Sequence, residues 1–209
     1  MDFKLLFPIL LFAFVFSSCE KEEEPDGGEN PPPVDISQQP ASVGDYRQGG
    51  IVFWVNPADS TQGLIVATND LFQSVRWGCY GTFIGHVNQA RLTNLYGGEQ
   101  NTADIRFSCN SADCAAYYCD VAVIEGYSDW WLPNRDEWRE IVKYLDIIEA
   151  AAASTPGGKG FYDKYWTSNQ PSGVVGEDLA RSFDIRNNIY DLDSKNELLS
   201  VRPVRAFAR

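Results

Sequence analysis

Residues 131–138 read Trp-Leu-Pro-Asn-Arg-Asp-Glu-Trp and mark the start of the clearest helix in the chain. Asn134 can cap the free amides of the first turn, and Glu137, three residues later, completes a capping box. The pattern predicts a helix from Asn134 to about Ile148 whose apolar face packs on another element. That face is formed by Trp138, Ile141, Val142, Leu145 and Ile148.

Strand patterns lie on both sides of this helix. Before it, Gly50–Val55 and Gly63–Ala67 are β-rich runs separated by the turn formers Asn56–Asp59, so they predict a hairpin. After it, three further stretches have strand character: Tyr165–Ser168, Arg181–Ile185 and Val201–Ala208.

The segment between the hairpin and the helix has a different character. Glycine and polar residues dominate residues 77–98, which predicts loops, and two helices are expected at Asn101–Phe107 and Ser111–Ile124. Helices that lie between an opening hairpin and closing strands predict an α+β fold.

Composition divides the chain into three segments. Residues 44–209 have the composition of one globular domain. Residues 19–43 are acidic, rich in proline and glycine, and too polar to bury a core, so we expect a tether. In residues 1–18, a lysine precedes a short apolar run that ends in Ser17-Ser18, which predicts a lipoprotein signal peptide.

Cys19 is the expected site of lipid attachment. It follows the signal segment directly and precedes Glu20-Lys21-Glu22-Glu23-Glu24. The alternatives are a plain secretory signal or an N-terminal membrane helix, and Pro8 and the short apolar run weigh against the helix. The acidic run resembles the export signal of surface lipoproteins in one Gram-negative phylum, which implies an outer-membrane protein exposed at the cell surface. Alternatively, the acids only make the tether soluble.

The charge distribution excludes one class of partner. Seven acids and one lysine between Glu20 and Gly44 account for half of the net charge of −12. The domain is therefore only mildly acidic and lacks the positive field that nucleic acids require. We expect no nucleic-acid partner.

The other four cysteines favour disulfides, because an exported chain meets an oxidising compartment. Their number allows three pairings. A zinc site made of four thiolates is the alternative, although the close Cys-x-x-Cys pairs typical of such sites are missing. The four residues are Cys79, Cys109, Cys114 and Cys119.

Two loops near the later strands, residues 169–178 and 187–197, are rich in side-chain oxygens. Such oxygens are the ligands that calcium prefers, and bound calcium can hold sugar hydroxyls. No cofactor is established by this pattern, and calcium is the one candidate. The alternative is that these residues form ordinary turns. The ligand-binding candidates in these loops are Asn169, Glu177, Asp178, Asn187, Asn188, Asp191 and Asp193.

Trp77 and Trp131 are the tryptophans with the best prospect of exposure, and an exposed indole could stack on a sugar ring. Packing in the core is the simpler interpretation of both. His86 lies in a glycine-flanked loop without a nucleophile motif, so we expect it to be a surface or structural residue.

Six short motifs occur in order along the domain: Gln48–Phe53, Trp77–Thr82, Gly126–Trp130, Trp131–Pro133, Tyr165–Ser168 and Val201–Phe207. Together they resemble the Lcl C-terminal domain family, named for a collagen-like adhesin. The resemblance covers residues 44–209 and implies a C-type-lectin-like fold with short antiparallel strands and two or three helices. It also implies that Cys79, Cys109 and Cys119 stand where the family carries cysteine, whereas Cys114 has no counterpart.

These observations predict a lipid-anchored envelope protein that is not an enzyme and whose domain binds a glycan, peptide or protein partner. One alternative is a hydrolase that acts on envelope or extracellular glycans through paired carboxylates. Another is an architectural component of a surface assembly. Two cooperating acids in a pocket favour the hydrolase, exposed tryptophan or converging Asp and Asn side chains favour binding, and featureless loops favour architecture.

Overall fold

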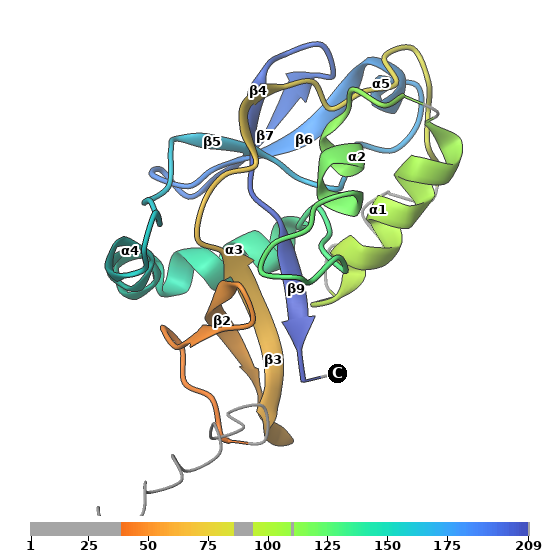
Figure 1. Cartoon of the computed structure of the whole chain (residues 1–209). Helices are drawn as coiled ribbons and strands as arrows, with labels where there is room; N and C mark the ends of the chain where they lie inside the picture. Colours follow the sequence, from red (N-terminus) through yellow and green to blue (C-terminus); the bar gives the residue numbers. More distant parts are fainter. Residues whose placement is uncertain (1–38, 86–93, 110, 209) are drawn as a thin grey trace, which may run out of the picture. The chain divides into compact units, whose positions relative to one another are not determined.

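The computed structural model describes residues 39–85, 94–109 and 111–208 (Figure 1). The expected signal peptide, Cys19, nearly all of the tether and His86 lie outside the described residues. Within the described ranges, no helix is both long enough and apolar enough to cross a membrane.

The first sheet contains the expected hairpin. Strands β2 (Gly50–Asn56) and β3 (Asp59–Ala67) pair antiparallel, and Ile51 lies opposite Val66. The short strand β1 (Tyr46–Arg47) extends the sheet on one side and β9 (Val204–Phe207) on the other, giving the order β1-β2-β3-β9. The last strand of the domain therefore returns to the first hairpin.

The second sheet has five strands in the order β4-β8-β5-β6-β7. Its strand pairs are antiparallel except for β5 with β8. The strands are β4 (Phe72–Val75), β5 (Lys164–Trp166), β6 (Leu179–Asp184), β7 (Ile189–Ser194) and β8 (Leu199–Val201).

The structure differs from one predicted strand and from one predicted loop. The expected strand Val201–Ala208 is two strands, because the chain leaves the second sheet after β8 and enters the first sheet as β9. Pro203, which has no amide hydrogen to donate, stands at the transition. The expected loop at residues 187–197 contains β7, which forms a hairpin with β6.

The helices are α1 (Gly97–Ser108), α2 (Ala115–Asp120), α3 (Arg135–Lys143), α4 (Leu145–Ser154) and α5 (Val175–Asp178). Figure 1 shows α1 and α2 next to each other, and the two are in contact. Helix α2 is shorter than the predicted Ser111–Ile124. The predicted helix Asn134–Ile148 is interrupted at Tyr144, whose backbone has φ −124° and ψ 25°.

The predicted capping box is present at the start of α3. The Asn134 side chain accepts hydrogen bonds from the amides of Asp136 and Glu137, at 2.9 and 3.0 Å. The Glu137 carboxylate accepts one from the Asn134 amide at 2.7 Å. These bonds satisfy amides that the helix itself cannot pair.

Large aromatic side chains fill the space between α3, α4 and the two sheets. Trp138 is fully buried, and its ring centre lies 4.8 Å from that of Tyr165 and 6.3 Å from that of Phe183. A second apolar cluster lies around Trp77 and Trp166, beneath α1 and α2. The protein is therefore an α+β domain with helices packed on two sheets.

Candidate functional site

Both tryptophans that were candidates for sugar stacking are buried. The Trp77 indole donates a hydrogen bond to the Thr167 carbonyl at 2.8 Å, and its side chain is fully buried. The Trp131 indole donates to the Glu137 carboxylate at 3.2 Å, and only 2% of Trp131 is exposed. Neither ring offers a face to a ligand, so core packing, the simpler interpretation, is what the structure shows.

Glu137 is a fully buried acid that accepts several hydrogen bonds. Besides Trp131 and Asn134, the amides of Tyr96 and Gly98 donate to its carboxylate, at 2.9 and 3.4 Å. Burial raises the pKa of Glu137 to about 7, and these hydrogen bonds oppose the rise. A carboxyl with this pKa could serve as a general acid. The protein itself surrounds it, however, so Glu137 fixes the start of α1 to that of α3.

The oxygen-rich side chains do not converge on one point. Asn169 is buried and accepts a hydrogen bond from the Arg135 amide at 3.1 Å. Glu177 and Asp178 belong to α5, whereas Asn187 and Asn188 lie in the turn between β6 and β7. No group of three or more His, Cys, Asp or Glu side chains that could hold a metal ion occurs among the described residues.

Asp191 and Asp193 lie on β7 and share a lysine. The Lys164 ammonium lies 3.1 Å from an Asp191 oxygen and 2.8 Å from an Asp193 oxygen. Hydrogen bonds from the Leu192 amide and from Lys164 lower the pKa of Asp191. Asp191 is therefore ionised at neutral pH, which is unsuitable for the proton donor of a glycoside hydrolase.

Two loops meet at the end of the second sheet where β6 begins. The Gly81 amide donates a hydrogen bond to the Glu177 carbonyl at 3.0 Å. A Cβ atom on Gly176 would lie 2.8 Å from the Phe83 ring, so the loops are in direct contact. Together they expose four apolar side chains, which we call the loop surface: Tyr80 (53% exposed), Phe83 (39%), Val174 (76%) and Val175 (53%).

A buried lysine lies beneath the loop surface. The Lys195 ammonium donates to the Thr82 carbonyl at 2.6 Å and to the Gln170 side-chain oxygen at 3.1 Å, and it lies 4.6 Å from the Trp77 ring centre. In the described part of the chain, no carboxylate forms an ion pair with it. Burial lowers the pKa of Lys195 to about 8, because the charged form has lost its water.

A disulfide also holds the loop that carries Tyr80 and Phe83. Cys79 is bonded to Cys109, which directly follows α1, and their Cα atoms are 5.7 Å apart. The Cys79 carbonyl also accepts a hydrogen bond from the Thr82 amide at 3.1 Å. The loop that carries Tyr80 and Phe83 is thus held to α1 by a covalent bond and to Gln170 through Lys195.

The other two expected disulfide cysteines are buried free thiols. Cys114 precedes α2 and Cys119 lies inside it. Residues five apart along a helix are separated by roughly 8 Å between Cα atoms, too far for a disulfide. Burial raises the pKa of both thiols. The second expected disulfide is therefore absent from the described residues.

The chain was compared with protein-family models and with curated proteins. No protein-family model matches the chain, and no curated protein matches its sequence.

Proposed function

We propose that this chain is a lipid-anchored protein of the bacterial envelope whose lectin-like domain binds a protein or peptide partner through the loop surface. One observation carries the proposal. Tyr80 and Phe83 are exposed on a loop that is held by the Cys79–Cys109 disulfide and by Lys195, and Val174 and Val175 are exposed at the start of α5, which contacts that loop.

Exposed apolar side chains of this kind are typical of binding surfaces. Apolar side chains that are exposed on neighbouring segments often mark a surface that another molecule covers. A rigid base lowers the entropy lost on association, so more of the contact energy appears as affinity. Glu177 is half-buried and Asp178 is exposed beside the patch, which favours a partner with an apolar centre and a basic rim.

The described acids support binding over hydrolysis. Glu137 is enclosed by protein donors, and Asp191 and Asp193 are bound to Lys164. The seven oxygen-rich candidates do not converge on one point, and the proposed contact is apolar. We propose the anchor at Cys19, the surface location and the kinship with the Lcl C-terminal domain on the sequence motifs alone.

The decisive experiment places a photo-crosslinking amino acid at position 174 of the full chain in cells, with position 123 as the matched control. Val123 is also an exposed valine, 68% exposed, outside the loop surface. We expect one partner to crosslink at 174 and not at 123. Val174→Asp should then weaken binding of the purified partner about tenfold or more, and Val123→Asp should not.

Equal crosslinking at the two positions contradicts the proposal. So does a crosslinked partner that binds Val174→Asp as tightly as the unchanged protein.

A further inference from the structure

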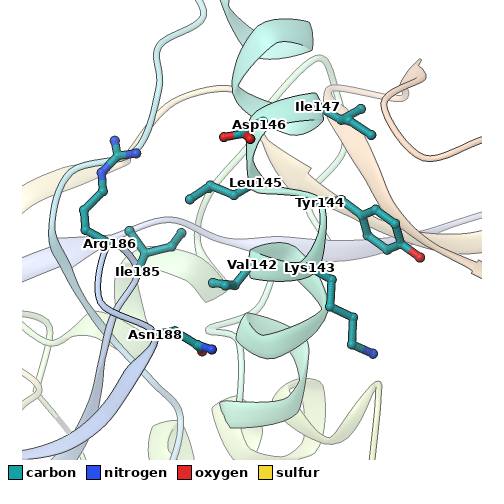
Figure 2. A pocket seen from close by; sticks show the side chains of 9 residues that line it. All are labelled: Val142, Lys143, Tyr144, Leu145, Asp146, Ile147, Ile185, Arg186 and Asn188. Carbon is teal, nitrogen blue, oxygen red and sulfur yellow. The ribbon is translucent and has the colours of Figure 1, made fainter.

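A hollow of about 380 Å³ lies between the end of α3, the start of α4 and the turn after β6 (Figure 2). Its two cations are already paired, since Arg186 is hydrogen-bonded to Glu149 and the Lys143 ammonium lies 2.5 Å from Glu140. Ile185 between them is only 1% exposed. The residues that line this hollow therefore select no class of ligand, whereas the cysteines beneath α1 and α2 have a specific chemistry.

The free thiol of Cys114 lies next to the disulfide. Cys109, Cys114 and Cys119 belong to one buried cluster, and Cys79 packs against it. A Cβ atom placed on Gly78 would lie 2.4 Å from the Cys114 Cβ and 3.5 Å from the Cys109 sulfur. The Cys114 Cβ is therefore separated from the Cys109 sulfur by at most the sum of these two distances.

The backbone at Cys114 gives this thiol more freedom than that of Cys119. Cys114 stands directly before α2 and has an extended backbone, with φ −143° and ψ 155°. The described residues between α1 and Cys114 belong to neither a helix nor a strand. Cys119, in contrast, is held inside α2. Cys114 can therefore approach the disulfide with less disturbance of α2 than Cys119.

An exchange of disulfides starts from a thiolate, because the thiolate is the form that attacks a sulfur. The Cys114 thiol donates to the Ser111 carbonyl at 3.5 Å, and the Arg106 guanidinium donates to the same carbonyl at 3.4 Å. Burial raises the pKa of Cys114; the amides of α2 and the charge of Arg106 oppose this rise, and the charge of Asp113 adds to it. The exchange should therefore be slow at neutral pH and faster at higher pH.

We propose that Cys114 exchanges with the Cys79–Cys109 disulfide and so releases the loop that carries Tyr80 and Phe83 from α1. The Cys114 thiol gives up its proton, and its sulfur forms a bond to the Cys109 sulfur. The bond between the sulfurs of Cys79 and Cys109 breaks, its electron pair stays on Cys79, and Cys79 takes up a proton. One disulfide replaces another, so the step needs no oxidant or reductant.

The exchanged form differs from the form in the structure in how the loop is held. The loop has lost its covalent link to α1, and hydrogen bonds such as that from Lys195 to the Thr82 carbonyl remain. Cys79 is half-buried, whereas Cys109 and Cys114 are at most 1% exposed, so the exchange frees the most accessible of the three sulfurs. An effect on partner binding rests on the proposed function of the loop surface, whereas the exchange itself does not.

The experiment traps the released thiol. The full chain in detergent micelles is treated with iodoacetamide at pH 8.5 without reductant, and its disulfides are mapped by mass spectrometry. Cleavage before Asp113 and after Tyr118 places the three later cysteines in different peptides. We expect Cys79 to become alkylated while a disulfide forms between Cys109 and Cys114.

Two matched variants test the role of Cys114. Cys114→Ser should lower the alkylation of Cys79 about tenfold or more, because the attacking sulfur is gone. Cys119→Ser also removes a buried free thiol of the same cluster and should leave the alkylation unchanged. The proposal is overturned if Cys79 of the unchanged chain stays unlabelled, or if Cys114→Ser is labelled there as fast as the unchanged chain.

A third variant tests the new disulfide directly. Cys79→Ser, treated with oxidised glutathione as the oxidant, should join Cys109 to Cys114, and Cys79→Ser/Cys114→Ser should form no disulfide at Cys109 within the domain. The proposal is also overturned if Cys79→Ser leaves Cys109 and Cys114 unjoined, or if Cys109 pairs with Cys119 instead. These measurements need no partner, so their failure is distinct from a failure of the proposed function.

Discussion

At the scale of single residues, Lys195 organises the loop surface. A buried ammonium is costly unless its hydrogens are bonded, and here carbonyl oxygens of the protein do this without a carboxylate. Nothing in the residues around Lys195 indicates this role, because a lysine between turn residues is typical of an exposed side chain. Only the approach of Thr82 and Gln170, distant in sequence, encloses it.

The pH dependence of stability should reveal this lysine. Its pKa is lowered from 10.5 to about 8 in the folded chain. Between these values the unfolded chain binds more protons than the folded chain, so the free energy of unfolding should rise with pH. The gain is at most about 3 kcal/mol between pH 8 and 10.5. Urea unfolding at a series of pH values measures it.

Lys195→Met should abolish this rise, and Lys143→Met, at an exposed lysine, should retain it. A rise of the same size in Lys195→Met assigns the effect to other groups and contradicts the prediction.

At the scale of elements, the sequence predicted the features that depend only on neighbouring residues, namely a hairpin and the start of a helix. The hairpin of β2 and β3 follows from two β-rich apolar runs separated by turn formers, and the start of α3 follows from Asn134 and Glu137. The break at Tyr144 was not predictable, since nothing in the neighbouring residues stops a helix there. The division of Val201–Ala208 between two sheets likewise depends on pairing with β5 and β3, far away in sequence.

The Cys79–Cys109 disulfide links the loop that carries Tyr80 and Phe83 to α1. Its removal should lower the free energy of unfolding. The double variant Cys79→Ser/Cys109→Ser should lose about 2 to 4 kcal/mol of unfolding free energy, because the unfolded chain regains the freedom of a 30-residue separation. Urea unfolding checks this. Cys119→Ala, which changes a buried free thiol, should lose about 1 kcal/mol.

A reductant provides the control within one protein. Reduction should lower the stability of the unchanged chain to that of the double variant and leave the double variant unaffected. If the unchanged chain does not respond to reductant, the disulfide does not stabilise it.

At the scale of the whole domain, the loop surface lies where β6 begins. The sequence analysis singled out residues 169–178 and 187–197 for their side-chain oxygens. It favoured oxygen ligands, whereas the loops expose Val174 and Val175 and bring in Tyr80 and Phe83. A composition rich in Asp and Asn cannot reveal convergence, since that depends on how the strands pair.

The lipid proposed on Cys19 should hold the whole chain to the membrane. Each buried methylene contributes roughly 0.8 kcal/mol to membrane binding, so loss of the acyl chains should release the protein. We expect Cys19→Ala to move the chain from the detergent phase to the aqueous phase in a phase-partition assay, and mass spectrometry of the unchanged protein should find lipid on Cys19. Cys114→Ala is the matched control and should stay in the detergent phase. If Cys19→Ala remains there as well, the anchor proposed at this residue is wrong.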